Sequence, residues 1–509
     1  MNFKLFLFYL IFFNVSASSF EARKPNQSHE VSFNDDELLK RSIEKAYSEK
    51  KELVLEANRV YNISKPLNIK CSIDGKNATI IANMDDVRAI SISENNIAIK
   101  NLKIGGERFK MLDVEADNVI LDNCHITTAS YFVLVRINGD NCSILNSELV
   151  NNFKDRHQYA IKNKDKSSIN KLSIKGNKIY GGIYLENEFP KLVGGYIIND
   201  NTINIDYSHV NQNLYKQHDG FHFAGIKGID IINNTIKFKN VNRGFKLTDY
   251  QPKNKNKKVS AFPTTEVTIK DNDIESNSVN GKQLFDLYDG TAIINIVNNK
   301  IRSIGHTTLF EDKTAFALPD LRQLTIIGNK IYFDFRVLYY RGAKDGQKLS
   351  KDVNLIIRDN DFYFTRANQN KTMKRVGSKL DFKMDYLLFV RTISNFEFEN
   401  NKFHSIDLPN PFKSTYLFYV YEVEKVKIDN NKMNGGVLYQ RKDKDSFLFS
   451  NNIVDEISLS SLVEVRGKNK KTSGIKIDGN TIIHSGSKFK VLNISGNKAF
   501  SNNDVKKKK

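Results

Sequence analysis

The stretch Ile174-Lys-Gly-Asn177-Lys-Ile179 decides the fold, because its pattern returns through most of the chain. The pattern is an apolar residue, two variable residues, Asn, one variable residue and a second apolar residue. Further copies centre on Asn201, Asn234, Asn272, Asn299, Asn329, Asn360, Asn401, Asn431, Asn452, Asn480 and Asn497, with looser copies around Asn123 and Ser147. A repeat of about 20–40 residues is typical of a solenoid, in which each repeat forms one coil.

The physical chemistry of the pattern indicates which solenoid it forms. Apolar residues two apart lie on one face of a strand, so the Ile residues around each Asn predict β-strands with a buried face. Asn tolerates left-handed backbone and marks a bend. In stacked coils the Asn side chains would also stack, and each amide could bond the next in an internal ladder.

This pattern resembles that of the right-handed parallel β-helix, the fold of the pectate-lyase-like superfamily of exported polysaccharide-active proteins. The resemblance covers about residues 60–500 and concerns the fold more than any activity. We therefore expect an all-β chain that forms one single-stranded right-handed parallel β-helix of about 13–15 coils, with an N-terminal capping helix. The resemblance implies a function on polysaccharides, as in pectate lyases, polygalacturonases, alginate epimerases and phage tailspikes.

The N-terminus predicts export. Lys4 precedes an apolar run from Leu5 to Val15, and small residues follow at 16–19, as in a secretory signal peptide. The run is too short for a membrane-spanning helix, which needs about 20 apolar residues. We expect residues 1–19 to be the signal peptide and the mature protein to be secreted or periplasmic, without a membrane anchor.

The first mature segment, residues 20–60, predicts a cap with a helix and the first strands. Asn34 and Glu37 have the spacing of a capping box, and Leu39, Ile43 and Ala46 mark one helix face. Such a helix would cover the open end of the solenoid. We expect the β-helix to span residues 61–500, and the Lys-rich tail, residues 501–509, to be disordered.

Charge favours a polyanionic partner. The 509 residues carry 77 Lys and Arg against 58 Asp and Glu, a formal net charge of +19. An exported chain without tryptophan or a nucleic-acid motif favours an acidic polysaccharide over nucleic acid. The three cysteines, Cys71, Cys124 and Cys142, fall at coil positions too far apart for a disulfide, and we expect them to be buried thiols.

Several coils contain an apolar strand that ends in arginine, which predicts a substrate-binding stripe. Guanidinium groups bind carboxylates well, and aromatic rings stack on sugars. The alternative is that each Arg packs over neighbouring coils and pairs with a local Asp. The residues assigned to substrate binding are Arg136, Arg341, Arg391, Arg441, Tyr339 and Tyr340.

Chemistry-bearing residues gather at equivalent points of four consecutive coils. Because stacked coils lie ~4.8 Å apart, these residues could face one groove. Between them they offer bases, cations and carboxylates, which are the groups that proton abstraction and glycoside hydrolysis require. The catalytic candidates are His218, Asp219, His222, Arg243, Lys246, Asp286, Asp289 and Glu311.

One part of this set has a weak local similarity to mannuronan C5-epimerases, whose His-Asp and later Arg arrangement resembles His218-Asp219 and Arg243. Lys216 and Gln217 stand where the fuller signature of those enzymes has Asp and Pro. Asp219-Gly220 is also similar to polygalacturonases, but the next coil lacks their paired-Asp motif. Neither family's site can therefore be carried over whole.

Three functions remain. The first is C5-proton abstraction from an acidic polysaccharide by a lyase or epimerase, with His218 or His222 as base and Arg243 or Lys246 neutralising the uronate. The second is a glycoside hydrolase with paired carboxylates among Asp219, Asp286, Asp289, Glu311 and Asp312. The third is a non-catalytic polysaccharide-binding protein for exopolysaccharide assembly or export. We expect a monomer, no metal site and no cofactor, with Ca²⁺ as the ion that a lyase would accommodate.

Overall fold

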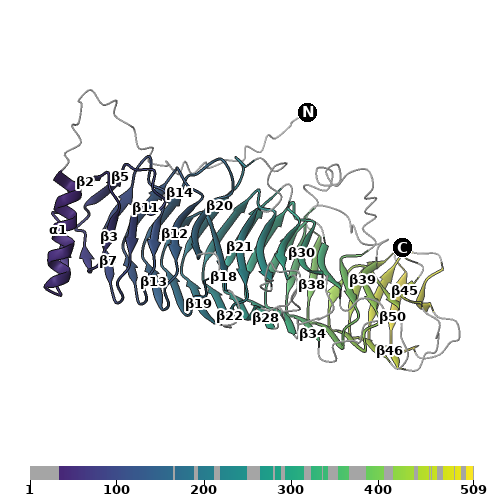
Figure 1. Cartoon of the computed structure of the whole chain (residues 1–509). Coiled ribbons are helices and arrows are strands. Elements are labelled where there is room, and N and C mark those ends of the chain that lie inside the picture. The colour runs from purple at the N-terminus through teal and green to yellow at the C-terminus, as the bar shows by residue number, and fades with distance from the viewer. Residues whose placement is uncertain are drawn as a thin grey trace, which may run out of the picture.

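The computed structural model of the chain is an elongated stack of parallel strands with one helix at its N-terminal end (Figure 1). The structure describes residues 34–163, 167–187, 193–210, 218–248, 264–278, 281–287, 293–313, 323–334, 336–341, 353–365, 386–405, 416–440, 445–457, 459, 461–466, 474–485, 488–493 and 500–507. The predicted signal peptide and the candidates Asp289 and Arg441 lie outside these residues.

Sheet A, the first of three long parallel sheets, has 17 strands. In chain order they are β1 (Leu53–Val54), β4 (Ile73–Asp74), β7 (Ala98–Lys100), β10 (Ile120–Asp122), β13 (Cys142–Leu145), β16 (Leu172–Lys175), β19 (Gly194–Asn199), β22 (Lys227–Ile232), β25 (Thr265–Lys270), β28 (Ile293–Val297), β31 (Gln323–Ile327), β34 (Asn354–Arg358), β37 (Asn395–Glu399), β40 (Lys425–Asp429), β43 (Ser446–Ser450), β46 (Ile475–Asp478) and β49 (Phe500–Ser501).

Sheet B follows sheet A in every coil. Its strands are β2 (Val60–Ile63), β5 (Thr79–Ala82), β8 (Lys103–Gly105), β11 (His125–Thr128), β14 (Glu148–Asn151), β17 (Lys178–Tyr180), β20 (Thr202–Asp206), β23 (Thr235–Lys239), β26 (Asp273–Asn277), β29 (Lys300–Ile304), β32 (Lys330–Phe333), β35 (Asp361–Phe364), β38 (Lys402–Ser405), β41 (Lys432–Met433), β44 (Ile453–Ile457), β47 (Thr481–His484) and β50 (Asp504–Lys507).

Sheet C completes each coil and has 16 strands. They are β3 (Leu67–Ile69), β6 (Ile90–Ile92), β9 (Leu112–Val114), β12 (Val133–Ile137), β15 (Tyr159–Asn163), β18 (Gly182–Glu186), β21 (Asp219–Ala224), β24 (Arg243–Thr248), β27 (Gln283–Asp286), β30 (Thr308–Lys313), β33 (Arg336–Arg341), β36 (Leu388–Arg391), β39 (Tyr416–Tyr421), β42 (Gly436–Gln440), β45 (Ser461–Arg466) and β48 (Lys490–Asn493).

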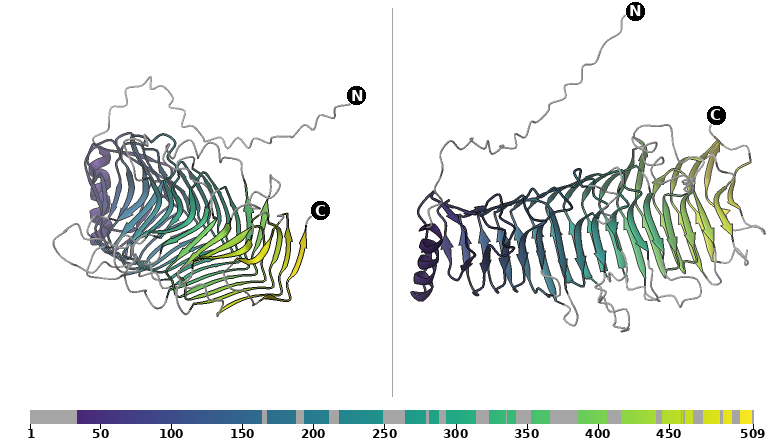
Figure 2. Two further views of the ribbon diagram at one scale, coloured as in Figure 1. Left: turned by 90° about the vertical axis from the view of Figure 1, so that its right-hand side faces the viewer. Right: turned by 45° about the horizontal axis from the view of Figure 1, so that its top comes forward.

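Each strand pairs in parallel with the strand three places later, which makes the chain a right-handed parallel β-helix and confirms the expected fold class (Figure 2). Identical core residues stack between coils. The rings of Phe221, Phe245, Phe285 and Phe310 form one column, with centroids 4.9, 4.8 and 4.9 Å apart. The coils outnumber the expected 13–15, because the first ones carry Ala78, Leu102 and Cys124 where later coils carry the ladder residue.

The corner between sheets A and B contains the Asn ladder that the repeat predicts. Asn299 shows its bonding: its Oδ1 accepts hydrogen bonds from the backbone N–H and the Nδ2 of Asn272, both at 2.9 Å. Its own Nδ2 donates to Ile269 O at 2.8 Å and to Asn329 Oδ1 at 3.0 Å. The same scheme links each buried Asn to the next coil, so the repeat satisfies polar groups that would otherwise be buried without partners.

One predicted position of the ladder was wrong, and another lies outside the described residues. Asn123 occupies the left-handed bend position (φ 52°), and the inner position of its coil is Cys124, whose N–H donates to Ser147 Oγ at 3.0 Å. At the other end the ladder passes from Asn480 to Asn503, with Nδ2 2.9 Å from the next Oδ1. Asn497 lies outside the described residues.

Helix α1 (Asn34–Ser48) covers the first coil, as the sequence indicates. Leu39 and Ile43 are buried against the core, while Asp35 and Asp36 attach the helix to β2 and to the turn that follows it. Asp35 Oδ2 accepts from Asn62 N at 3.0 Å, and Asp36 Oδ1 accepts from Ser64 N at 2.9 Å. Within the described residues, no helix is long and apolar enough to span a membrane.

The connections between strands differ in length from one corner of the coil to another. From β13 onward, two residues always separate the strand of sheet A from that of sheet B, whereas the long connections lead into or out of sheet C. One of them lies between β18 and β19 and another between β20 and β21, while β19 and β20 themselves are joined by two residues. The three cysteines are free and buried, as expected.

Candidate functional site

The candidate site lies on the outer face of sheet C, where four neighbouring strands, β21, β24, β27 and β30, align polar residues in two rows. In the first row, His222 pairs in register with Lys246, which pairs with Asp286, which pairs with Glu311. The second row runs from Asp219 through Arg243 to Gln283. The structure therefore brings together six of the eight predicted catalytic residues.

Gly220 and Gly244 allow the two rows to share one face. A Cβ on Gly220 would lie 2.4 Å from a ring carbon of Phe238, and one on Gly244 would lie 2.5 Å from Leu284 Cδ1. Both glycines therefore face the core, as do the Phe residues that follow them. Two consecutive inward residues break the strand alternation and turn Asp219 and His222 to the same side.

Arg243 is the centre of a charged network. Its Nη1 lies 3.3 Å from Asp219 Oδ1, and its Nε lies 2.8 Å from Asp286 Oδ2. Lys246 Nζ lies 3.9 Å from Asp219 Oδ2, a longer and weaker contact. Burial lowers the pKa of Lys246 most, and Arg243 lowers it further, while Asp219 and Asp286 oppose the change. Lys246 is therefore the cation less tightly bound to the protein's own carboxylates.

His222 lies between this network and an aromatic side chain. Its Nδ1 is 3.8 Å from Asp219 Oδ2, and its ring centroid is 4.2 Å from that of Tyr184 on β18. Burial, followed by the charges of Lys246, Arg243 and Lys162, lowers the His222 pKa well below 6.5. Its Nε2 has no hydrogen-bond partner among the described residues. The arrangement supplies a neutral imidazole with a nitrogen lone pair at neutral pH.

Asp286 and Glu311 form a carboxylate pair on adjacent coils. Burial raises the pKa of Asp286 to about 6; Arg243 opposes the rise, and Asp219 and Glu311 add to it. Glu311 accepts a hydrogen bond from Gln283 Nε2 at 2.6 Å. One carboxyl group can thus hold a proton near pH 6 while its neighbour is held as an acceptor.

His218 belongs to a different group of buried rings. Its ring centroid lies 6.4 Å from that of His157 and 6.1 Å from that of Tyr207. Burial, with the charges of His218, Arg156 and Lys162, lowers the pKa of His157 to about 4. Of the two histidines considered as a base, His222 is the one in register with the Lys and carboxylate row.

The predicted substrate-binding stripe divides into parts. Arg136 is paired with buried Asp113, its Nε 2.8 Å from Oδ1, which fits the alternative of local pairing. Tyr339 faces outward and stacks on Phe389 with centroids 4.9 Å apart. Tyr340 faces the core and is 1% exposed, so its assignment to substrate binding was wrong, because adjacent strand residues point to opposite faces.

Two further stripe residues, Arg341 and Arg391, lie in another row on sheet C, two residues beyond Tyr339 and Phe389 along their strands. Arg341 pairs in register with Arg391, and the Cζ of Arg391 lies 4.7 Å from the ring centroid of Tyr421. Arg136 lies in the other row, that of His222, so the arginines do not form one continuous ladder. The side chain of Arg341 lies outside what the structure describes.

Sequence reasoning missed Tyr184 and Gln283. Tyr184 pairs in register with His222, but residues 207–218 separate β20 from β21 and conceal that register in the sequence. Gln283 lies on the same strand as Asp286, and an amide has no charge that would mark it as a candidate in the sequence. Counting outward positions back from the Phe column would have found both residues.

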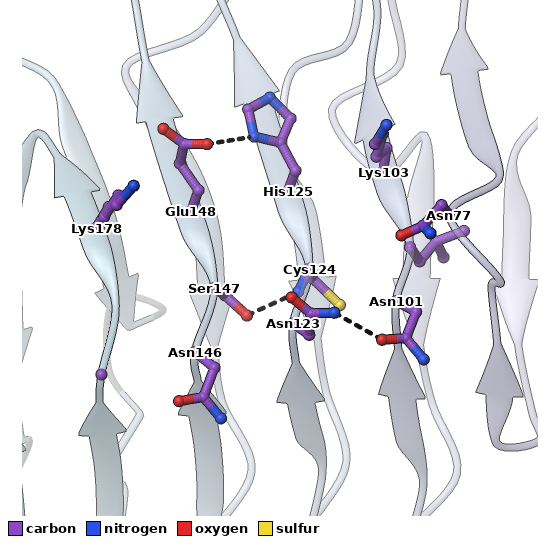
Figure 3. A pocket seen from close by; sticks show the side chains of 12 residues that line it. Asn77, Asn101, Lys103, Asn123, Cys124, His125, Asn146, Ser147, Glu148 and Lys178 are labelled. Carbon is purple, nitrogen blue, oxygen red and sulfur yellow. Dashed lines mark hydrogen bonds and ion pairs between the residues drawn. The ribbon is translucent and has the colours of Figure 1, made fainter. Parts of the chain in front are cut away.

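A separate hollow lies at the corner of sheets A and B, near the N-terminal end (Figure 3). Asn101, Asn123 and Asn146 line one side, and His125 and Glu148 project from neighbouring strands on the other, with Nδ1 3.0 Å from Oε2. It shares no residue with the site on sheet C. In the described part of the chain, no group of three or more His, Cys, Asp or Glu side chains could hold a metal ion.

Solved structures with a similar architecture include tailspike proteins and a polysaccharide lyase. A double mutant of the tailspike protein of E. coli bacteriophage HK620 has 10% identity and a TM-score of 0.34 over 93% of this chain and 75% of that chain. A mannuronic acid specific polysaccharide family 6 lyase from human gut microbiota has 12% identity and a TM-score of 0.25 over 86% and 81%. No family model matches the chain, and no curated protein matches it. Identities this low describe the architecture and not the site.

Proposed function

We propose that this chain is an exported carbohydrate-active protein that abstracts the C5 proton of a uronic acid in an acidic polysaccharide, as a lyase or a uronate epimerase. The observation that carries the proposal is the neutral, buried His222 with Lys246 and Arg243 on the next coil. A base beside cations is the combination that acidifies and removes a proton next to a carboxylate.

In this mechanism His222 Nε2 takes the C5 proton. Lys246 binds the uronate carboxylate, which stabilises the negative charge that develops when C5 loses its proton. Arg243 is held by Asp219 and Asp286 and acts as a fixed positive charge behind Lys246. Asp219, 3.8 Å from His222 Nδ1, favours the imidazolium that forms.

Tyr184 supplies the second proton position. In β-elimination the C5–H electron pair forms the C4=C5 double bond and the C4–O bond breaks. The Tyr184 hydroxyl, which donates to Glu186 Oε2 at 3.1 Å in the structure, turns to donate its proton to the departing oxygen. The proton on His222 then returns to Tyr184 through solvent. In epimerisation the C4–O bond stays intact, a water molecule donates a proton to the opposite face of C5, and the imidazolium of His222 releases its proton to the resulting hydroxide.

The polymer class follows from charge and from the predicted export. The net charge of +19 favours capture of a polyanion, and the predicted signal peptide directs the protein to polymers outside the cytoplasm, in a secreted or periplasmic location. We propose that the protein acts as a monomer without a membrane anchor.

A glycoside hydrolase is the second candidate, because Asp286 and Glu311 lie one coil apart and the Asp286 pKa is about 6. A protonated Asp286 could act as general acid with Glu311 as its carboxylate partner. This alternative needs neither His222 nor Tyr184, so the two mechanisms predict different sensitive residues.

Absorbance at 232 nm separates these candidates, measured while the purified protein meets alginate, pectate, glycosaminoglycans and bacterial capsules. The lyase form of the proposal predicts a rise that His222→Ala abolishes and Asp286→Asn only reduces. Shortening of a polymer without a rise, abolished by Asp286→Asn and retained by His222→Ala, would replace the proposal by the hydrolase. Binding without any chemical change would leave a polysaccharide-binding protein.

A further inference from the structure

The outer face of sheet B carries a second charged surface, on a different sheet from the candidate site on sheet C. Strands β29, β32, β35, β38 and β41 place one outward row in register: Lys300, Lys330, Asp361, Lys402 and Lys432. Two residues further along each strand, a second outward row contains Arg302, Tyr332, Tyr363 and His404. We call these two rows the sheet B strip.

Three rings form a stacked column in the strip. The centroids of Tyr332 and Tyr363 are 4.6 Å apart at an interplanar angle of 14°, and those of Tyr363 and His404 are 4.5 Å apart at 13°. Arg302 Cζ lies 5.5 Å from the Tyr332 centroid, and Lys330 Nζ lies 5.7 and 5.3 Å from the two Tyr centroids. Cation–π attraction therefore holds both cations against a rigid column.

The strip has more positive charge than its own carboxylates neutralise. Asp273 pairs with Lys300 at 2.9 Å, and Asp455 pairs with Lys432 at 3.5 Å. Asp361 Oδ1 lies 3.1 Å from His404 Nε2, a contact that is an ion pair only when the imidazole is protonated. Among the described residues, no carboxylate lies within 4.0 Å of the cationic groups of Arg302, Lys330 or Lys402. All three are exposed, on three coils of the same face.

The ring geometry discriminates between polyanions. Single-stranded nucleic acid binds by stacking bases on accessible aromatic faces. In the strip the faces of Tyr332 and Tyr363 cover one another, so edges, hydroxyl groups and cations are what a ligand meets. Such a surface suits a polymer whose charges are carboxylates or sulfates and whose hydroxyl groups accept and donate hydrogen bonds.

We infer that the sheet B strip is a non-catalytic binding site for acidic polysaccharide, which holds a second stretch of polymer while sheet C acts on another. Arg302 and Lys330 lie on adjacent coils, and Lys402 lies two coils beyond Lys330 with Asp361 between them. Their separations are therefore multiples of the coil spacing of ~4.8 Å, which is comparable to the length of one sugar residue. The inference shares with the proposed function only the class of polymer, and it involves no residue of the sheet C site.

The test measures the binding of fluorescently labelled alginate and pectate oligomers to the whole protein by anisotropy at several salt concentrations. The test variant is the triple substitution Arg302→Gln, Lys330→Gln and Lys402→Gln. A matched control removes three exposed charges elsewhere, with Lys40→Gln, Lys227→Gln and Lys425→Gln. We expect the test variant to bind at least 10-fold more weakly with a shallower salt dependence, and the control to bind within 2-fold of the parent.

Equal losses in the test variant and the control would overturn the inference, because net charge alone would then explain the binding. Equal affinity for a single-stranded DNA oligomer, lost in the test variant, would overturn the polysaccharide assignment. If no polymer showed C5 chemistry while the strip still bound uronate oligomers, the proposed function would fail and this inference would stand.

Discussion

The corner between sheets A and B and the outer face of sheet C treat buried polar groups in opposite ways. At the corner, each Asn repeats the same hydrogen bonds, as Asn299 does with Asn272 and Asn329. On sheet C, neighbouring coils place different groups in one row: an imidazole, an ammonium and two carboxylates. The corner gives uniform polar satisfaction, and sheet C gives a mixed electrostatic environment that shifts pKa values.

This difference separates the residues that determine how the coils stack from those that form the candidate site. The repeating Asn specifies how coils stack, and its strict two-residue connection leaves no room for variation. The proposed chemistry lies on sheet C, whose connections vary in length and whose outward rows place different side chains on neighbouring coils. Substitutions at the corner should therefore change stability, and substitutions on sheet C should change turnover.

The largest effect is expected for His222→Ala. Loss of the base should lower the rate of proton abstraction by about 10³-fold, within the range typical of a removed general base. Thermal unfolding should accompany the assay, because the buried His222 ring packs against Tyr184 and its removal also costs packing. His125→Ala, on an exposed face of sheet B, is the control and should keep the parental rate. Equal rates for the parent and His222→Ala would dissociate the chemistry from this row.

The next effect concerns the corner. Asn299→Ala removes the acceptor of the buried Asn272 N–H and the side-chain donor to Ile269 O, and these unpaired buried groups should cost about 3 kcal/mol. Denaturant unfolding measures this loss, and the turnover of the folded fraction should stay parental. Asn298→Gly changes the exposed left-handed residue (φ 55°) just before it and should cost less than about 0.5 kcal/mol. If both variants lost the same stability, the ladder would not be what holds the coils.

Tyr184→Phe sharpens the description of the sheet C site. It removes the hydroxyl while keeping the ring beside His222, so β-elimination should slow by about 10²-fold. Exchange of the C5 proton should persist, because His222 still removes it. Measuring elimination at 232 nm and C5 exchange on the same sample gives both rates, and parallel loss of the two would assign Tyr184 to substrate positioning instead.

The last prediction concerns the pH dependence of the free energy of unfolding. Burial raises the Asp286 pKa from 3.8 to about 6, so the folded state holds a proton that the unfolded state releases between these values. Stability attributable to this group must therefore fall as pH rises from about 4 to 6 and then stay constant, a change of roughly 3 kcal/mol. The free energy of unfolding of the parent should fall relative to that of Asp286→Asn as pH rises from about 4 to 6. A constant difference between the two proteins would exclude the shifted pKa.

The sequence predicts the fold well because the fold is a local rule applied many times. The Ile-x-x-Asn-x-Ile pattern states the strand, the bend and the stack in six residues. The number of coils was underestimated because Ala78 and Leu102 replace Asn in the early coils. Asn123 was assigned one residue too early for the related reason that both corner positions can be Asn.

The site was only partly predictable. His222, Lys246 and Asp286 could be grouped because they fall in consecutive, recognisable coils. Tyr184 was missed because a long connection hides its register with His222. Tyr340 was misassigned because neither the alternation nor its composition says which of two adjacent tyrosines faces out. These failures share a cause: register depends on pairing between coils, which single stretches do not encode.

The central claim is that sheet C removes the C5 proton of a uronic acid, and proton NMR of acidic polysaccharides incubated with the protein in D₂O tests it most directly. We predict loss of the C5 proton signal, either with a new olefinic H4 signal from elimination or with an intact chain from exchange during epimerisation. His222→Ala should retain the signal. New reducing ends with every C5 proton intact would contradict the account and identify the carboxylate pair Asp286 and Glu311 as the catalytic groups instead.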